Sequence, residues 1–343
     1  MPHLQKDTTM QKILVDIKDS KIGFLTGGTA VRSSMSDIIA KKDNIFRIQF
    51  SSKPDTRLLK DISDFLIDNP HIDLRFYGNY SEDLIDWELL NNIQGLFIDL
   101  WETRELNGIK NLKQLKRLGI SKNVKSSVSL KVIENLDNLE MLFTSISKDI
   151  ETIGLLKKIG LISLSEIKTD NLDFISNNIN LSKVWISLGS IKDISGIAKI
   201  QNLKTLSIHQ LRGFDDLAAN SVLANCNNIE ILELMNLANL HSFKFISNLK
   251  GLSTLNLEGL KKIDSYKYFG QCDGLKVLSG YDCRPLDKTL IGLENLDSIM
   301  LGDSYSKSEI DSFLQRFKGQ NLWIRGKQIL GNNNFGGRIS ILN

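Results

Sequence analysis

The sequence has few of the residues that mark disulfide-bonded, fibrous or membrane-spanning proteins. It holds three cysteines in 343 residues, Cys226, Cys272 and Cys283, and none belongs to a CxxC pair. This excludes a disulfide framework and favours a reducing compartment. Only four prolines are present, which suits an ordered, non-fibrous chain. No run of about 18 apolar residues occurs and the N-terminal sequence lacks an apolar signal segment, so we expect a cytoplasmic protein that does not span a membrane.

Net charge and reactive residues are equally sparse. Lysine and arginine exceed aspartate and glutamate by 43 − 40 = 3, so no strong field draws the chain to nucleic acid or to an acidic membrane. His3, His71, His209 and His241 are scattered, and no HxxxH pair with a glutamate predicts a zinc hydrolase. The sequence 26–29 has two glycines but no GK[ST] after them, which favours a tight turn over a phosphate loop. We expect no cofactor, no metal and no enzymatic activity.

What the chain does contain is one short pattern many times. Leu203, Leu206 and Ile208 show it, with apolar residues at an anchor and three and five residues later. From Ile93 onward, successive anchors lie 20 to 26 residues apart over ten intervals, a register that chance does not hold. Such self-similarity indicates a solenoid. With units that have a polar or glycine member included, the anchors are Ile45, Asn69, Ile93, Leu115, Leu139, Ile159, Leu181, Leu203, Ile229, Leu252, Leu275, Leu296 and Gly319.

This pattern resembles the leucine-rich repeat family, whose short form reads LxxLxLxxN with a period of about 20 to 29 residues. The resemblance implies an α/β solenoid: a horseshoe with a concave parallel β-sheet, short turns or helices on the convex side, and about 12 to 13 repeats. The Lys/Asn/Ile-rich composition is similar to the short, irregular bacterial type, with about 22 residues per repeat.

The match to this family is weak at the asparagine position. Asn123 alone conforms, and the equivalent residue elsewhere is apolar, as at Leu211, Leu237, Leu260 and Cys283. In the family this asparagine bonds backbone groups along the stack, so its general absence predicts an apolar spine. Cys283 is then expected to be a buried spacer rather than a nucleophile.

The ends of the repeat region suggest caps, because a terminal repeat must cover a core that has no neighbour on one side. We expect an N-terminal cap at 1–44, one solenoid domain at 45–325, and a C-terminal cap or flexible tail at 326–343. Apolar spacing predicts further local elements. These are short strands at 13–17, 22–25 and 339–342, a helical turn at 36–40, and longer helices at 56–69 and 306–318.

Alternation along each strand predicts which side chains point away from the core. In LxL the two leucines face one side and the residue between them faces the other. Positions two, four and six after each anchor should therefore line the solvent face of the sheet, which is the concave face of a leucine-rich repeat. The aromatic residues there either pack across the sheet or anchor a partner. The candidates for protein binding on this face are Phe97, Phe143, Trp185, His209, Glu233, Met235, Glu258, Tyr281, Met300, Asp303, Trp323 and Arg325.

The C-terminal third of this face suggests the chemistry of a partner. It combines Glu233, Glu258, Asp282 and Asp303 with methionine and aromatic residues, which predicts a protein with a basic surface, such as a toxin or an enzyme. We therefore expect a non-catalytic bacterial scaffold, first of all an immunity or inhibitor protein that neutralises a toxin. Blocking an enzyme requires only a shaped surface and no chemistry of its own.

Other roles stay open. An adaptor or an exported effector would use the same kind of face. A nucleic-acid-binding solenoid would use a basic stripe formed by Arg47, Arg75, Arg117 and Lys183, although the near-neutral total charge weighs against it. Neither a membrane nor a small-molecule substrate is an expected partner.

Overall fold

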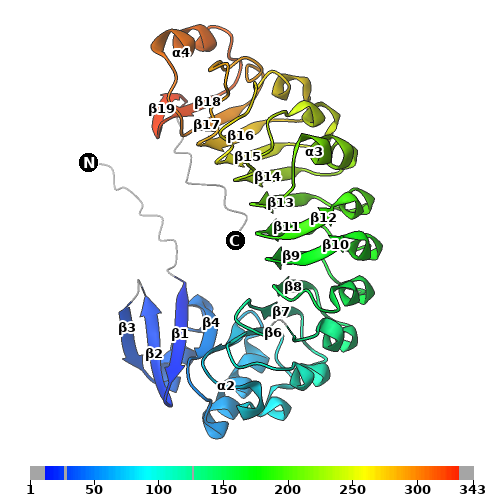
Figure 1. Cartoon of the computed structure of the whole chain (residues 1–343). Helices are drawn as coiled ribbons and strands as arrows, with labels where there is room; N and C mark the ends of the chain where they lie inside the picture. Colours follow the sequence, from blue (N-terminus) through cyan, green and yellow to red (C-terminus); the bar gives the residue numbers. More distant parts are fainter. Residues whose placement is uncertain (1–11, 27–28, 126, 332–343) are drawn as a thin grey trace, which may run out of the picture. The chain divides into compact units, whose positions relative to one another are not determined.

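The computed structural model describes residues 12–26, 29–125 and 127–331, and the chain forms two compact units, 1–159 and 160–343 (Figure 1). Each unit stacks parallel β-strands that are joined by short helical connections. Every repeat returns the chain to the same side before the next strand begins, so successive strands pair in parallel. Both units are α/β solenoids, which confirms the predicted fold class.

The first unit begins with an antiparallel meander. Strand β1 (Ile13–Lys18) pairs with β2 (Lys21–Thr26), and β2 pairs with β3 (Thr29–Ser33). Helix α1 (Met35–Ala40) follows, with Ser34 as its N-cap. The two short strands and the helical turn expected in this region are confirmed. Because β1 also pairs in parallel with the first repeat strand, the sheet runs from the meander into the repeats.

The described part of the first unit has five repeat strands, each paired in parallel with the next. They are β4 (Ile45–Phe50), β5 (Asp73–Gly78), β6 (Gly95–Leu100), β7 (Arg117–Ile120) and β8 (Met141–Thr144). Helix α2 (Thr56–Asp68) joins β4 to β5, as the helical spacing predicted. The remaining connections use 3-10 helices, η1 (Lys42–Asn44), η2 (Glu82–Leu84), η3 (Trp87–Leu90), η4 (Asn107–Asn111), η5 (Leu130–Asn135) and η6 (Ile150–Leu155).

The second unit continues the pattern with eight repeat strands among its described residues. They are β9 (Leu161–Ser165), β11 (Lys183–Ser187), β13 (Thr205–His209), β14 (Ile231–Met235), β15 (Thr254–Glu258), β16 (Val277–Tyr281), β17 (Ser298–Leu301) and β18 (Asn321–Ile324). These pair in parallel in that order. The five and eight strands together give thirteen repeats, in agreement with the 12 to 13 expected.

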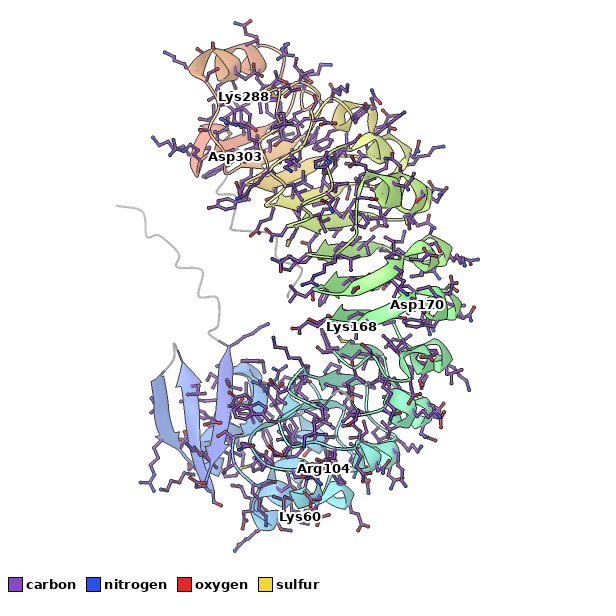
Figure 2. The ribbon with its side chains drawn as sticks, in the orientation of Figure 1. Lys60, Arg104, Lys168, Asp170, Lys288 and Asp303 are labelled. Atoms are coloured by element: carbon purple, nitrogen blue, oxygen red, sulfur yellow. The ribbon has the colours of Figure 1, made fainter. Side chains whose placement is uncertain are left out.

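The connections of the second unit are again short. Strands β10 (Lys168–Asn171) and β12 (Ser190–Asp193) pair in parallel and form a separate two-stranded sheet. Lys168 and Asp170 of β10 are labelled in Figure 2. Helices α3 (Asp216–Val222) and α4 (Lys307–Leu314) are the two α-helices in the described part of the second unit, and α4 lies within the predicted 306–318. The 3-10 helices are η7 (Asp173–Asn177), η8 (Ser195–Lys199), η9 (Leu223–Asn225), η10 (Lys244–Asn248) and η11 (Phe269–Gln271).

The core of each unit consists of the apolar repeat positions. Leu203 is 2% exposed, and Leu206 and Ile208 are completely buried. Of all the anchors and their partners three and five residues later, Gly319 alone is not buried. Burying a leucine or isoleucine contributes about 1.5 to 3 kcal/mol, and each repeat shares that burial with its two neighbours. The solenoid is therefore stabilised by contacts between adjacent repeats.

The spine after the strands is apolar, as predicted, with one correction. Leu211, Leu237, Leu260 and Cys283 are at most 5% exposed. Asn123, the residue expected to conform to the family asparagine, is instead exposed. Its N–H is bonded to the Ser121 hydroxyl at 3.2 Å, which closes a local turn, and the next residue, Val124, is the buried one. No asparagine therefore occupies the spine at this repeat.

The C-terminal end of the described chain adds a strand that the sequence did not predict. Strand β19 (Lys327–Leu330) pairs antiparallel with β18, and the tight turn uses Arg325 and Gly326, both with positive φ. The predicted strand at 339–342 and the glycines of the predicted turn at 26–29 lie outside the described residues. The predicted boundaries of cap, solenoid and tail stay a prediction.

Candidate protein-binding face

The solvent face of the second unit presents two parallel rows of side chains, because equivalent residues of adjacent strands stand directly opposite one another. We name the row four residues after each anchor the central row and the row six residues after it the end row. The central row is Ser163, Trp185, Ser207, Glu233, Asn256, Ser279, Met300 and Trp323. The end row is Ser165, Ser187, His209, Met235, Glu258 and Tyr281.

This register brings most of the predicted residues together. The central row holds Trp185, Glu233, Met300 and Trp323, and the end row holds His209, Met235, Glu258 and Tyr281. The two remaining candidates of this unit, Asp303 and Arg325, lie just beyond the ends of β17 and β18; Asp303 is labelled in Figure 2. Phe97 and Phe143 belong to the first unit and face their own sheet.

The aromatic side chains of the second unit differ in exposure. Tyr281 is 61% exposed, and its ring lies over Gly302, where an added Cβ would come within 2.3 Å of the ring. Trp185 and Trp323 are half-buried, and Nε1 of Trp323 has no hydrogen-bond partner. Large, rigid rings held in place by their neighbours lose little conformational entropy when a partner covers them.

Glu233 and Asn256 form the centre of the face. Glu233 is 8% exposed and Asn256 is 7% exposed, and Nδ2 of Asn256 donates to Oε1 of Glu233 at 3.0 Å. Burial raises the pKa of the Glu233 carboxyl, and the hydrogen bonds from Asn256 and Ser207 oppose that rise only in part. The sequence assigned Asn256 to the solvent face without choosing it as a site residue. Its place directly across from Glu233 in the next repeat was the available signal.

The other carboxylates of the predicted acidic region are partly engaged within the chain. Oδ2 of Asp303 accepts the N–H of Cys283 at 2.9 Å. Asp282 lies 3.4 Å from Nζ of Lys261, in a pair that is well exposed. An exposed pair of this kind contributes about 0 to 1 kcal/mol, so Asp282 remains accessible to another cation. Asp303 serves the turn after β16 and is a weaker candidate for contact with a partner.

The first unit resolves the question of the basic stripe. Nε of Arg117 donates to Oδ1 of Asp73 at 2.8 Å, and Nη2 of Arg47 lies 3.5 Å from Oδ2 of the same carboxylate. Arg75 donates to Oδ2 of Asp99 through both Nε and Nη2. The three arginines are thus each paired with a carboxylate one or two strands away. Lys183, the fourth member of the stripe in the nucleic-acid alternative, lies on β11 in the second unit. The three arginines of that alternative are therefore not free charges.

Phe97 and Phe143 pack on their neighbours across the sheet. Their ring centroids are 5.8 Å apart, and the Arg47 guanidinium lies over Phe97 at 3.9 Å from the centroid. Phe97 also covers Gly119, where an added Cβ would lie 2.1 Å from its ring. Both phenylalanines remain half-buried. Packing across the sheet therefore accounts for these two residues, as one of the two explanations proposed.

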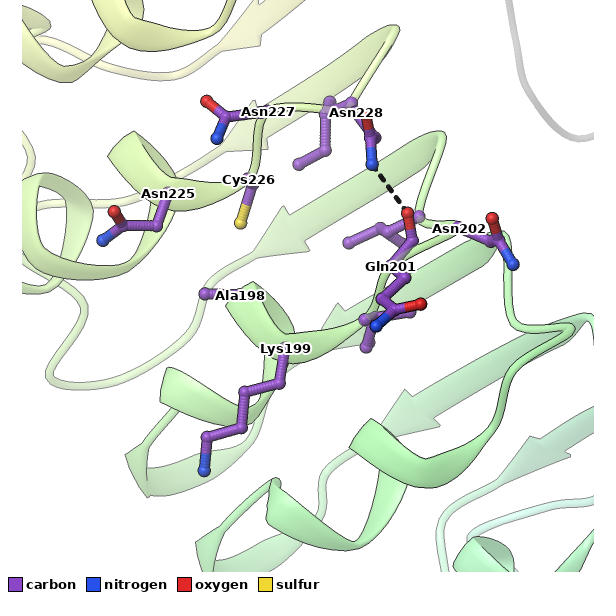
Figure 3. Close-up of a pocket in the computed structure, with 11 residues that line it drawn as sticks. Ala198, Lys199, Gln201, Asn202, Asn225, Cys226, Asn227 and Asn228 are labelled. Carbon is purple, nitrogen blue, oxygen red and sulfur yellow. Dashed lines mark hydrogen bonds between the residues drawn. The ribbon is translucent and has the colours of Figure 1, made fainter.

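Cysteine and amide side chains border a hollow on the surface of the second unit. This hollow of about 500 Å³ lies where η8 and η9 lead into the next strands, and asparagines and Gln201 line much of it (Figure 3). Cys226 borders this hollow, but burial raises the pKa of its thiol to about 12, so it is not a nucleophilic thiolate. Cys283 is a buried spacer, as predicted, and its thiol pKa is also raised by burial to about 12.

Within the described residues, no group of three or more His, Cys, Asp or Glu side chains could hold a metal ion, and no helix is long and apolar enough to cross a membrane. Among the amides that line the hollow of Figure 3, Asn202 and Asn228 donate to backbone carbonyls of the preceding repeat, to Ile179 at 2.6 Å and to Gln201 at 2.7 Å. These two amides therefore join adjacent repeats.

No protein-family model and no curated protein matches the sequence. Among solved structures, the chain is similar to the internalin InlF of Listeria monocytogenes, with 14% identity, a TM-score of 0.42, and coverage of 79% of this chain and 77% of that one. Internalin C2 of the same organism shows 18% identity, a TM-score of 0.33, and coverage of 56% and 73%. TLR13, in a complex with ssRNA13, shows 15% identity, a TM-score of 0.42, and coverage of 75% and 50%. By its own stacked LxxLxL strands, the chain is a leucine-rich repeat solenoid.

Proposed function

We propose that this protein is a non-catalytic scaffold that binds a protein partner through the solvent face of its second unit. The observation that carries the proposal is the exposure of Tyr281 on the same continuous parallel sheet as half-buried Trp185 and Trp323. Aromatic residues of this kind are the ones most enriched in binding hot spots. A rigid sheet presents them without the cost of ordering a loop on binding.

The acidic character of the same face supports a partner with a basic surface. Glu233, Glu258 and Asp282 lie on or beside the two rows, together with Met235. A toxin or an enzyme with a basic active-site rim would be complementary to them. We therefore propose a bacterial, cytoplasmic immunity or inhibitor protein as the first role, with an adaptor or an exported effector as the alternatives that use the same surface.

Binding of nucleic acid is the less favoured alternative. The arginines of the first unit are paired with Asp73 and Asp99, and an arginine that already holds a carboxylate has less to gain from a phosphate. The formal net charge of the whole chain is only +3.

The proposal is tested with the full-length chain, tagged and purified from its native cell so that the co-eluting protein can be identified and then made separately. Tyr281→Ala and Trp323→Ala are each expected to lower the affinity for that partner by about 30-fold, which corresponds to a loss of about 2 kcal/mol of binding free energy at a hot spot. Leu217→Ala is the matched control, because Leu217 is 76% exposed on α3, away from the rows. Unchanged affinity in both aromatic variants would show that the partner binds elsewhere.

A further inference from the structure

Carboxylates on the solvent face are satisfied differently in the two units. In the first unit Asp73 pairs with Arg47 on the adjacent strand and with Arg117 two strands away, and Asp99 pairs with Arg75 on the adjacent strand. Each of these carboxylates therefore has a cation from the chain itself. A carboxylate removed from water is stabilised in this way because the opposite charge replaces much of its lost hydration.

Glu233 in the second unit has no such cation. Its carboxylate is bonded by the Asn256 amide at 3.0 Å and by the Ser207 hydroxyl, both neutral groups, and among the described residues no lysine, arginine or histidine forms an ion pair with it. Asn256 adds a second unmet requirement, because its Oδ1 is buried and accepts no hydrogen bond. A buried acceptor without a donor costs about 1 to 3 kcal/mol.

Small side chains flank this pair along the central row. Ser207 separates Glu233 from Trp185 along the central row, and Ser279 separates Asn256 from Met300. Strands lie about 4.8 Å apart, so the two small serines set the larger side chains back from Glu233 and Asn256 on both sides. Glu233 and Asn256 are thus flanked by serines, with one aromatic and one thioether side chain beyond them in the same row.

We propose that Glu233 and Asn256 form a seat for one arginine side chain of the protein partner. The proposal rests on the proposed function and names the contact at its centre. A planar guanidinium carries five N–H donors and can bond a carboxylate and a neighbouring amide oxygen at once, whereas a lysine ammonium acts as a point charge. Its flat face suits the Trp185 side of the pair, where a cation is attracted to the indole ring.

The seat is tested without the partner, by titrating full-length protein with N-acetylarginine amide and with its neutral isostere, N-acetylcitrulline amide. The protein is labelled with 13C at the methionine methyl groups, of which the chain has six. Met235 lies two residues along β14 from Glu233, and Met300 stands one strand beyond Ser279. Met235→Leu and Met300→Leu assign the two signals. We expect the arginine probe to shift both signals saturably, and the citrulline probe to bind at least about tenfold more weakly.

Two variants locate the effect. Glu233→Gln keeps the shape of the side chain and is expected to weaken the arginine probe about tenfold or more. Glu230→Gln makes the same change of charge on an exposed carboxylate outside the two rows and is expected to change the affinity by less than about twofold, as a long-range screened effect. Equal shifts with citrulline, or an unchanged affinity in Glu233→Gln, would overturn the seat.

The outcomes separate this inference from the proposed function. Loss of partner binding in Tyr281→Ala and Trp323→Ala, together with no arginine selectivity at Glu233, would leave the binding face in place and remove the seat. Arginine-selective binding that depends on Glu233 supports the seat, whatever the two aromatic variants do to the partner.

Discussion

At the scale of single residues, the end of each repeat strand requires an unusual backbone conformation. The residue seven positions after the anchor has a positive φ of about 49 to 66° in consecutive repeats of the second unit, and its N–H bonds to the neighbouring strand in most of them. Only one of these positions is occupied by glycine, the residue that tolerates this conformation best. The residues are Glu166, Leu188, Gln210, Asn236, Gly259 and Asp282.

Gln210→Gly is therefore expected to stabilise the protein. Gln210 has φ 49° and is exposed, so glycine relieves backbone strain while little buried surface is lost. Part of the gain is offset by the greater freedom of glycine in the unfolded chain, which leaves about 0.5 to 1 kcal/mol. Urea unfolding measures the effect. The reciprocal change, Gly259→Ala, should destabilise, since its φ is 66° and an added Cβ would lie 2.1 Å from Asn236.

Glu233 predicts a stability that depends on pH. Its pKa in the folded protein is raised by burial above the ordinary value of 4.5, so the native state holds the proton more tightly than the unfolded chain. The ionised carboxylate thus costs stability at neutral pH, and that cost disappears as the pH falls through the raised pKa and below 4.5. Glu233→Gln should be more stable than wild type at pH 7, with a difference that closes near pH 4 in thermal unfolding measured at both values.

The same variant joins stability to binding. If Glu233 served only the fold, Glu233→Gln would not both raise the stability at pH 7 and lower the affinity for the arginine probe. That opposite movement is the pattern expected of a functional residue kept at a cost to the fold.

At the scale of secondary-structure elements, asparagines join the turn before one strand to the turn before the next. In each case the side-chain amide donates to a backbone carbonyl of the previous repeat: Asn138 to Lys113 at 2.8 Å, Asn202 to Ile179 at 2.6 Å, and Asn228 to Gln201 at 2.7 Å. Each of these asparagines directly precedes an anchor and so lies before the strand, whereas the asparagine of the leucine-rich repeat pattern follows it. These bonds satisfy carbonyls that the short 3-10 connections leave without partners.

Asn228→Ala tests this role. The substitution leaves the Gln201 carbonyl without its amide donor (Figure 3) and should lower the free energy of unfolding by about 1 kcal/mol. Asn227→Ala is the matched control, because Asn227 is exposed in the same turn, and it should change stability by less than about 0.5 kcal/mol. Equal effects of the two substitutions in chemical denaturation would contradict the assignment.

At the scale of the whole molecule, the balance of charge hides a difference between the two units. The solvent face of the first unit pairs its arginines with aspartates, while that of the second unit includes a buried carboxylate without a cation. A net charge close to neutral therefore gives little guide to what either surface binds. The partnering of each charge with its neighbours across the sheet decides that.

Heparin chromatography measures this partnering. The wild-type protein should elute at low salt, because Arg47, Arg75 and Arg117 are held by carboxylates. The double variant Asp73→Asn with Asp99→Asn leaves the arginines without those carboxylates and should elute at clearly higher salt, since each freed cation adds to the salt dependence of polyanion binding. Wild-type retention equal to that of the double variant would show that the arginines are already free and would revive the nucleic-acid alternative.

The local pattern explains why so much of the fold was predictable. The repeat register predicted the buried anchor positions of every repeat except Gly319, and helical spacing located α2 and α4. Both patterns depend on residues close in sequence. The prediction that Asn123 occupies the position of the family asparagine was wrong. The N–H of Asn123 bonds to the Ser121 hydroxyl in a local turn, and the side chain that is buried after this strand is that of Val124. Strand β19 was missed because its four residues are all exposed and lack an apolar face.

The sequence by itself determined the solenoid, its thirteen repeat strands and the set of side chains that face solvent. The reason is that a period of 20 to 26 residues and an LxL strand leave one way to bury the leucines. Only the tertiary structure decided what those side chains do. Whether a carboxylate is paired, as Asp73 is, or buried without a cation, as Glu233 is, depends on neighbours one or two repeats away in the chain. Those neighbours meet only after the strands have stacked, so no local pattern records the result.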